Sequence, residues 1–520
     1  MIKLDINSLL RRKGKKWVIL YCIYCVNFAV FLLYIFLLEP YWGDINLTVS
    51  GWVDSKINIV LIVGIVIIIP LIYGLSLLTI KLRRLIKTNR IKPHIIHKIL
   101  PITLIIIYNL LILVLLDLLE EYANVIFQSI EFYSFFVFLG LDIVLIVLLY
   151  PLLKIIPQLK ENLSDKFIKA DRKRIIILTC ILGGYVITYA TPFIIIPSNV
   201  LYYELPPKPE LIAHRGASHL APENTIEAGE AALSYDLVVG WEVDIQISYD
   251  GVPFLMHDDT LTRTTNISEH FPNRKDNKAY TFNISELREL DAGSWFVDDD
   301  PFGVIASGIV SKASAEAFRG INIPTFEEVL NFTRDNNYLI DFDADRPPEG
   351  HPYHENFYEI LLNMTIESGM DLSKSMIPTG NSGWIEMIRN SAPEIQLGWP
   401  GSPLVQEFQS SATNYTYINT GDGYSNEEYR ALKMADIDTM VWTIESVERF
   451  YQLWCLGVDW VKTNSPYKFN DLESNFLVFP VFPYITIWVA ICIVALSSID
   501  IIRQKLKEKQ VNMLERSTHF

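Results

Sequence analysis

Long apolar segments alternate with short polar ones over the first 200 residues of the chain, and a further apolar segment lies near its end. Each is long enough to cross a bilayer, which requires about 20 mostly apolar residues. The segments cover residues 17–38, 57–80, 99–116, 132–156, 175–196 and 476–499. We therefore expect a membrane region with five transmembrane helices at 1–197, a sixth transmembrane helix at 476–499 and a tail at 500–520.

Basic residues flank these segments unevenly. Lys and Arg cluster before the first segment and after the second, fourth and sixth, whereas the first and third loops are acidic. Because short basic loops remain in the cytoplasm, we expect both termini there and residues 198–475 outside, in a multi-pass protein of the plasma membrane. Six Asn-x-Ser/Thr sequons fall on the outer side and are candidate glycosylation sites: Asn46, Asn266, Asn283, Asn331, Asn363 and Asn414.

Strand-like and helix-like patterns alternate through residues 198–475. The nine strand-like runs are 211–215, 240–248, 252–258, 338–344, 373–378, 395–399, 414–419, 439–444 and 459–464. The second and third runs are too close for a crossover helix, so they form a hairpin and leave eight parallel strands. This pattern predicts an α/β fold, a (β/α)8 TIM barrel, with an insertion at about 261–322 over the barrel mouth.

The hairpin predicts which side chains meet. A two-residue turn at Asp250-Gly251 pairs Tyr249 with Val252 and places His257 opposite Asp244. Cross-strand neighbours share a face of the sheet.

Acidic residues dominate this segment, which holds 44 Asp and Glu against 18 Lys and Arg. Such a balance disfavours nucleic acid as a partner and suits a cation. The segment contains a single cysteine, Cys455, so disulfides cannot hold it together and it depends on its own core.

Several polar residues lie at predicted strand ends, where barrel enzymes collect their functional groups. They are His214 and Arg215, Glu242 and Asp244, His257, and the alternating Asp341, Asp343 and Asp345. Carboxylates that converge on one site need a cation, and an all-oxygen site selects Ca²⁺ or Mg²⁺. Two histidines beside it can act as general acid and base, and an arginine can bind phosphate. From spacing alone, a solvated strand face remains an equal alternative.

The stretches LIAHRGASHLAPENTIEA, GWEVDIQISYDGVPFLMHDDTLTRTT and VWTIESVERFYQLWCLGVDWVKTN resemble the glycerophosphodiester phosphodiesterase family, in its multi-pass membrane branch. The resemblance covers residues 198–475 in the order of the family's motifs. It implies one divalent cation held by Glu242, Asp244 and Asp343. It further implies His214 and His257 as the acid and base, and Arg215 as the phosphate-binding residue.

Some residues remain open under this resemblance. Glu223, Asp341 and Asp345 are further site candidates, and Asp345 stands where the family usually carries a basic residue. We expect Asn224 to cap the first barrel helix. His219 belongs to no motif, and we expect it to take no part in the site.

The resemblance implies a metal-dependent hydrolase that cleaves glycerophosphodiesters at the outer membrane face. The products are an alcohol and glycerol phosphate, or glycerol and a head-group phosphate. One alternative is phospholipase-like cleavage of glycosylphosphatidylinositol-type or lysophospholipid substrates. Another is a catalytically weakened receptor or scaffold. Asp142 is almost the only charged residue well inside an apolar segment, so we expect the helices to anchor the enzyme and not to transport a solute.

Overall fold

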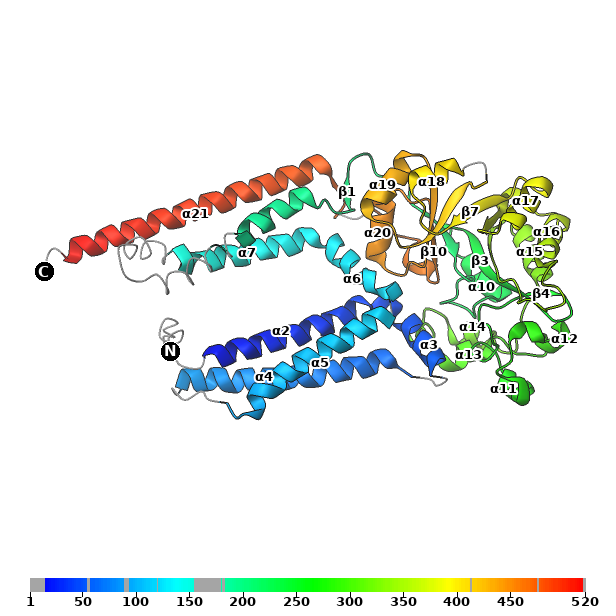
Figure 1. Ribbon diagram of the computed structural model, residues 1–520, viewed down its shortest axis with the longest axis horizontal. Coiled ribbons are helices and arrows are strands. Elements are labelled where there is room, and N and C mark those ends of the chain that lie inside the picture. Colours follow the sequence, from blue (N-terminus) through cyan, green and yellow to red (C-terminus); the bar gives the residue numbers. More distant parts are fainter. Residues whose placement is uncertain are drawn as a thin grey trace.

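The computed structural model describes residues 15–53, 57–87, 93–118, 120–153, 179, 183–411, 414–474 and 477–517. A barrel lies at one end of the molecule, and long helices run away from it toward the other end (Figure 1). The two connections between these parts lie side by side, because β1 (Val200–Leu201) pairs in parallel with β11 (Phe479–Pro480).

Eight parallel strands form a closed barrel, as the sequence predicted. They are β2 (Glu210–Ala213), β3 (Val238–Ile247), β5 (Leu339–Ala344), β6 (Ser375–Pro378), β7 (Gln396–Pro400), β8 (Tyr417–Gly421), β9 (Asp438–Trp442) and β10 (Trp460–Thr463). Each strand pairs with the next in chain order, and β10 closes the barrel on β2. All nine predicted strand runs, including the hairpin strand β4 (Pro253–Leu255), contain a strand.

Side chains alternate along each barrel strand between the axis and the surrounding helices. On β3, Trp241, Val243 and Ile245 join the main apolar core outside the barrel, whereas Glu242 and Asp244 lie on the opposite face. A smaller apolar cluster with members on four strands contains Ile212, Met376, Tyr417 and Met440. Polar groups therefore concentrate inside the barrel, near the carboxyl ends of its strands.

The hairpin register differs from the prediction by one residue. Ser248 pairs with Val252, and Gly251 adopts a φ of +90°. The loop thus has three residues and ends on a left-handed glycine, a common alternative to the two-residue turn. Asp244 consequently faces Met256, whose N–H donates to the Asp244 carbonyl at 3.0 Å. His257 lies one residue beyond that pair.

Helices cover the outside of the barrel (Figure 1). They are α10 (Ile226–Ala232), α15 (Phe326–Asp335), α16 (Phe357–Glu367), α17 (Ser382–Ser391), α18 (Val405–Ser410), α19 (Asn426–Met434) and α20 (Val447–Leu456). The insertion holds four short helices, α11 (Ile267–His270), α12 (Ile284–Leu287), α13 (Ser294–Asp299) and α14 (Lys312–Glu316). Much of it packs around a small core of its own that includes Phe254 and Phe282, so the insertion is ordered despite its weak periodicity.

Four of the described helices are long and apolar enough to span a membrane, not the six that we expected. They are α2 (Lys15–Leu37), α4 (Ile59–Lys87), α5 (Ile96–Leu118) and α21 (Val481–Ser517). The fourth predicted segment corresponds to α7 (Ser134–Leu153). Residues 134–143 of α7 form an apolar stretch that is shorter than a membrane span requires. The fifth lies partly outside the described residues, and its second half is helical at 183–194. Helix α21 also continues through most of the expected tail.

Two further helices connect the spanning helices to the barrel. They are α3 (Trp42–Trp52), which follows α2, and α6 (Glu120–Phe132), which follows α5. Gln128 of α6 donates to Asp422 just after β8 at 2.5 Å, and Gln452 donates to the Gln128 carbonyl at 2.9 Å. The Tyr41 hydroxyl, just before α3, accepts from the Glu445 N–H just after β9 at 3.3 Å. The membrane helices therefore meet the barrel at the carboxyl ends of its strands.

Candidate active site

A pocket of about 560 Å³ opens at the carboxyl ends of the barrel strands. His214, Arg215, Glu223, His257 and Asp258 are among the residues that line it. Functional groups of barrel enzymes collect at this end, because the strands converge there and the following loops are free to vary.

An acidic cluster lies at this end of the barrel. Carboxylate oxygens of Glu242, Asp244 and Asp343 lie within 4.8 Å of one another. Burial, followed by the neighbouring Asp244, raises the pKa of Glu242 well above its usual value, and the same causes raise the pKa of Asp343. The raised pKa values of Glu242 and Asp343 indicate that these two carboxylates do not readily ionise together without a cation.

The donor set fits a hard divalent cation. All three candidate ligands offer oxygen, which Mg²⁺ and Ca²⁺ prefer. The hydrogen bonds found within the described ranges use Oε2 of Glu242 and Oδ2 of Asp244, so Oε1 and Oδ1 remain for a cation. Glu223, His257 and Asp258 form a second cluster with spacing that could hold a metal ion. However, Arg263 already donates hydrogen bonds to the carboxylates of Glu223 and Asp258.

His214 is held as a neutral base. Its Nδ1 lies 2.7 Å from Oδ1 of Asn464, an acceptor, so Nδ1 carries the hydrogen and Nε2 carries the lone pair. Nε2 lies 3.9 Å from Glu242. Burial and the adjacent Arg215 lower the pKa of His214 well below its usual value. The hydrogen bond to Asn464 orients the ring and acts to raise the pKa, but burial and Arg215 outweigh it.

The pKa of His257 is shifted in the opposite direction to that of His214. Burial alone would lower its pKa, but the hydrogen bond of 2.8 Å from Nδ1 to Asp258 raises the pKa above the usual value. The ring reaches the pocket although the register of the hairpin differs from the prediction. The site therefore holds two histidines that favour different protonation states, as acid and base catalysis requires.

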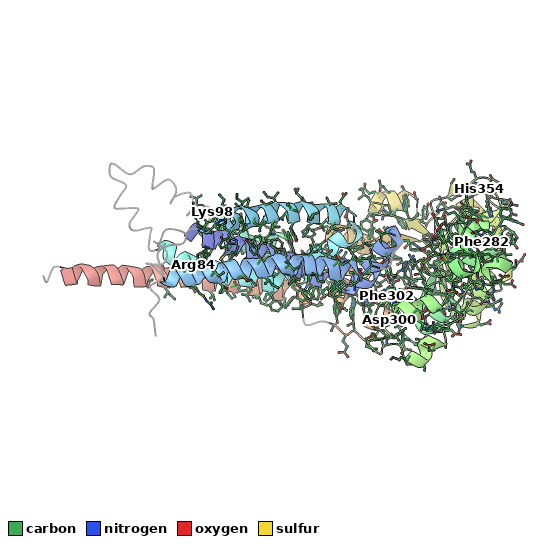
Figure 2. The ribbon with its side chains drawn as sticks, turned by 90° about the horizontal axis from the view of Figure 1, so that it is seen from below. Arg84, Lys98, Phe282, Asp300, Phe302 and His354 are labelled. Atoms are coloured by element: carbon green, nitrogen blue, oxygen red, sulfur yellow. The ribbon has the colours of Figure 1, made fainter. Side chains whose placement is uncertain are left out.

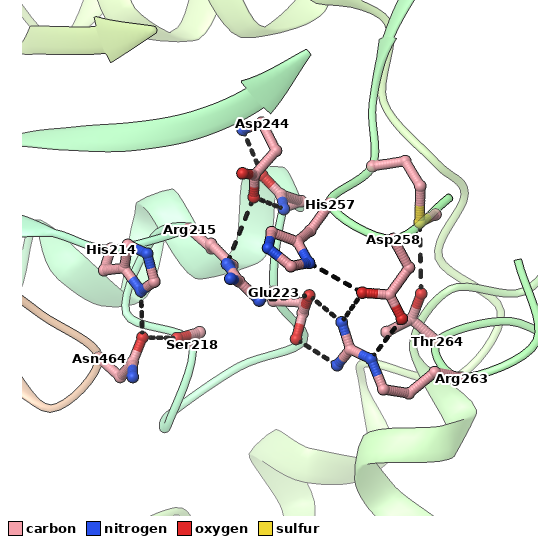
Figure 3. A network of polar contacts seen from close by, with 12 residues as sticks. His214, Arg215, Ser218, Glu223, Asp244, His257, Asp258, Arg263, Thr264 and Asn464 are labelled. Atoms are coloured by element: carbon pink, nitrogen blue, oxygen red, sulfur yellow. Dashed lines mark hydrogen bonds and ion pairs between the residues drawn. The ribbon is translucent and has the colours of Figure 1, made fainter. Parts of the chain in front are cut away.

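Arg263 organises one wall of the site and was not singled out from the sequence. It donates to both oxygens of Glu223 at 2.6 and 2.7 Å and to both oxygens of Asp258 at 2.6 and 2.8 Å (Figure 3). Arg263 and Arg215 lower the pKa of Glu223 to about 2 despite its burial. The signal that would have found Arg263 is its place in HDDTLTRTT, which includes the predicted His257.

Arg215 lies between the acidic cluster and Glu223. Its Nε lies 3.3 Å from Asp244, its Nη1 lies 3.3 Å from Glu223, and its backbone N–H donates to Glu242 at 2.8 Å. Its φ is 52°, a backbone conformation that non-glycine residues rarely adopt. Such strain persists only when surrounding contacts fix it, and these contacts direct the guanidinium into the pocket.

The prediction that Asn224 caps the first helix is wrong. Thr225 caps α10, because its side chain accepts from the Ala228 N–H. Asn224 instead donates to Oδ2 of Asp244 at 2.7 Å and accepts from the Asp244 N–H at 3.0 Å. It therefore orients a candidate metal ligand.

The remaining candidates lie in different surroundings. Asp341 is fully buried and forms an ion pair with Lys462 of β10, so its charge is already compensated. Asp345 is exposed. Arg346 turns away from the pocket, because its Nε donates to the His354 carbonyl at 2.9 Å. Lys462 is thus a basic residue near the acidic cluster that the sequence patterns did not reveal.

The fold and the site define a class of protein: a β/α barrel with an acidic cluster near two histidines and an arginine. A profile of the glycerophosphoryl diester phosphodiesterase family matches residues 214–468. The barrel of this chain therefore belongs to this family of phosphodiesterases.

Curated relatives also match outside the barrel. The mouse glycerophosphoinositol inositolphosphodiesterase GDPD2 (Mus musculus) is 31% identical over 322 residues, which cover 61% of this chain and 57% of the relative. Glycerophosphodiester phosphodiesterase domain-containing protein 4 from Macaca fascicularis is 27% identical over 499 residues, which cover 90% of this chain and 75% of the relative. The chain thus spans little more than half of the first of these relatives.

A solved structure of a glycerophosphodiester phosphodiesterase from Agrobacterium tumefaciens aligns with 51% of this chain and 100% of its own. The sequence identity is 20% and the TM-score is 0.39.

Proposed function

We propose that this protein is a cation-dependent phosphodiesterase that hydrolyses glycerophosphodiesters. The observation that carries the proposal is the pair of histidines beside the acidic cluster. Their pKa values shift in opposite directions, below the usual range for His214 and above it for His257. Environments that separate the pKa values of two titratable groups identify an acid and a base.

The residues suggest the course of the reaction. Arg215 binds a phosphoryl oxygen of the substrate. His214, through the lone pair on Nε2, takes a proton from the substrate hydroxyl group that attacks phosphorus, and water then hydrolyses the resulting cyclic phosphate. His257 gives a proton to the alkoxide oxygen that leaves phosphorus. Glu242, Asp244 and Asp343 would hold a divalent cation, Mg²⁺ or Ca²⁺, which when bound stabilises negative charge on the phosphoryl group.

The test uses the full-length protein, purified in detergent or nanodiscs. Glycerophosphoinositol and glycerophosphocholine are supplied with Mg²⁺, with Ca²⁺ or with EDTA, and the phosphate and alcohol products are identified. We expect turnover that EDTA abolishes, and loss of turnover in His214→Ala and Glu242→Ala. Absence of cation-dependent turnover in the wild type would overturn the proposal and favour a binding protein that has kept the barrel.

We also propose that the barrel faces the outside of the cell. Arg84 and Lys98 lie at the end of the helices far from the barrel (Figure 2), which is the end that the positive-inside rule assigns to the cytoplasm. Among the candidate sequons, the side chains of Asn283, Asn363 and Asn414 are exposed, whereas Asn46 accepts from the Val60 N–H at 3.2 Å. Deglycosylation of the cellular protein tests this: a mass shift abolished by changing these three residues to Gln supports it, and an unglycosylated, protease-protected barrel contradicts it.

A further inference from the structure

Glu445 is a buried carboxylate that the proposed reaction does not use. It lies just after β9, is 1% exposed, and borders the pocket that contains His214 and Arg215. Burying a carboxylate is costly unless its oxygens accept hydrogen bonds. The partners of Glu445 therefore indicate what its charge does.

The hydrogen-bond partners of Glu445 lie on the loop after β10. The hydroxyl of Thr463 donates to Oε1 at 3.0 Å, and the backbone N–H of Asn464 donates to the same oxygen at 2.6 Å. The hydroxyl of Ser465 donates to Oε2, and Nζ of Lys468 lies 3.6 Å from Oε2. Glu445 thus fixes the backbone of the loop that carries Asn464.

Asn464 connects this loop to His214. Its Oδ1 accepts from Nδ1 of His214 at 2.7 Å and from the hydroxyl of Ser218 at 2.7 Å (Figure 3). A neutral imidazole carries one hydrogen, so the hydrogen bond at Nδ1 is what leaves Nε2 free as a base. A displaced Asn464 would therefore misdirect the base.

Two contacts from the membrane region reach Glu445. Its backbone N–H donates to the Tyr41 hydroxyl at 3.3 Å. The ring of His219, which is 4% exposed, lies between two carboxylates, with Nδ1 3.8 Å from Glu445 and Nε2 3.4 Å from Asp44 of α3. The His219 backbone N–H also donates to the Asn464 carbonyl at 3.0 Å. The expectation that His219 takes no part in the site is therefore wrong.

Helix α3 packs closely against the barrel mouth. A Cβ atom on Gly43 would lie 2.6 Å from the ring of Phe302, so glycine permits this close approach. Phe302 lies where the insertion meets the helices (Figure 2), and its ring stacks on His219 with 3.9 Å between the ring centroids. The position of α3 therefore acts on His219 from two sides, through Asp44 and through Phe302.

We propose that Glu445 is a positioning residue for His214, and that α3 and its preceding turn hold Glu445 in place through Tyr41, Asp44 and His219. This inference rests on the proposed phosphodiesterase function, and adds that the membrane region completes the catalytic site of the barrel. Glu445 and His219 exchange no proton with the substrate, because they act through the loop after β10. A misplacement of about 1 Å in such a site costs about 100-fold in rate.

The first test removes and then restores the acceptor at Glu445. Full-length protein in nanodiscs is given glycerophosphoinositol or glycerophosphocholine with Mg²⁺ or Ca²⁺. We expect Glu445→Ala to lower kcat by about 100-fold, with KM within about threefold of wild type. Glu445→Gln keeps one oxygen that can accept from the loop, so its kcat should fall only about tenfold. A raised KM with unchanged kcat would show that Glu445 contacts the substrate, which overturns the inference.

The second test displaces α3 without touching Glu445. Gly43→Ala places a methyl group against Phe302, whereas Gly64→Ala adds the same group to α4. At Gly64, among the described residues, no atom outside the neighbouring stretch of the helix lies within 4 Å of the added carbon. We expect kcat to fall at least about tenfold in Gly43→Ala and in His219→Ala, and to remain within about twofold of wild type in Gly64→Ala.

A binding measurement separates lost positioning from general disruption. The rise in unfolding temperature with Mg²⁺ or Ca²⁺ is recorded for every variant. We expect the cation concentration needed for a given rise to stay within about twofold of wild type, because the acidic cluster is untouched.

Each outcome decides between the readings. A lower kcat with an unchanged cation response supports the inference. Wild-type kcat in folded Glu445→Ala, or in both Gly43→Ala and His219→Ala, overturns it, as does joint loss of kcat and cation response. If Glu445→Ala does not fold, the kcat of Glu445→Gln decides, and a wild-type value overturns the inference. Failure of the wild type to cleave either substrate overturns the proposed function itself.

Discussion

Lys462 and Asp341 form an ion pair inside the barrel, where Asp341 is fully buried and Lys462 is 5% exposed. Burial opposes the charge of Lys462, but Asp341 and then Glu242 raise its pKa. Four carboxylates, those of Glu242, Asp244, Asp341 and Asp343, thus face two fixed cations, Lys462 and Arg215. Arg215 also pairs with Glu223, so Lys462 is a second source of buried positive charge beside the acidic cluster.

We expect Lys462→Met to destabilise the protein by about 3–5 kcal/mol, because it leaves Asp341 buried without a partner. The double variant Lys462→Met with Asp341→Leu should recover most of this loss, since it removes both charges together. Thermal unfolding of the full-length protein measures both effects. A double variant no more stable than the single one would show that Lys462 is needed for a reason other than this pair.

Cation binding should depend on Glu242, Asp244 and Asp343 and not on the nearby Asp345. A cation that binds only the folded protein stabilises it by RT ln(1 + c/Kd), where c is the cation concentration, so the unfolding temperature rises with c. We expect Asp343→Asn to require at least about tenfold more Mg²⁺ or Ca²⁺ for the same shift. Asp345→Asn, two positions further along, should require less than about twofold more. A larger effect at Asp345 would place that residue among the ligands.

The pH dependence of activity should reveal His257 as an acid. Its pKa is raised above the usual value, so the proton needed by the leaving group is present at lower pH and is lost as the pH rises through that raised pKa. We therefore expect kcat/KM to decline on the alkaline side. Asp258→Asn should move this decline to lower pH, because it removes the charge that favours protonated His257. Asp259→Asn is the control, because Asp259 is exposed and pairs with Lys278. This variant should leave the pH of the decline unchanged.

Glu223 should contribute stability that acid removes. Its pKa falls to about 2 in the folded protein from an ordinary 4.5, so its contribution is complete above about 4.5 and is lost as the pH falls toward 2. Glu223→Gln should cost about 3–5 kcal/mol at neutral pH, because Arg215 and Arg263 lose a buried partner. Its stability should also fall less steeply than that of the wild type between pH 4.5 and 2, and an unchanged slope would contradict this assignment.

The strand pattern was predictable because one physical rule governs it. Strands of a barrel bury one face toward the axis and the other toward the helices, so apolar runs of the right length recur between helical patterns. All nine runs contain a strand. Glu242, Asp244 and Asp343, which were expected together, lie within one cluster, because neighbouring parallel strands end at the same rim. The hairpin register was not predictable, since Asp250-Gly251 suits both a two-residue and a three-residue loop.

By itself the sequence determined the barrel, most of its membrane helices and the residue types at the mouth, because periodicity and strand order are local properties. The tertiary structure decided which distant residues meet. It joined Lys462 to Asp341, Arg263 to Glu223 and Asp258, and Asn224 to Asp244, although 20 to 121 residues separate most of these partners along the chain. It also seated α3 across the mouth through Phe302 and His219. Such contacts depend on how separate elements pack, and no pattern within one element records them.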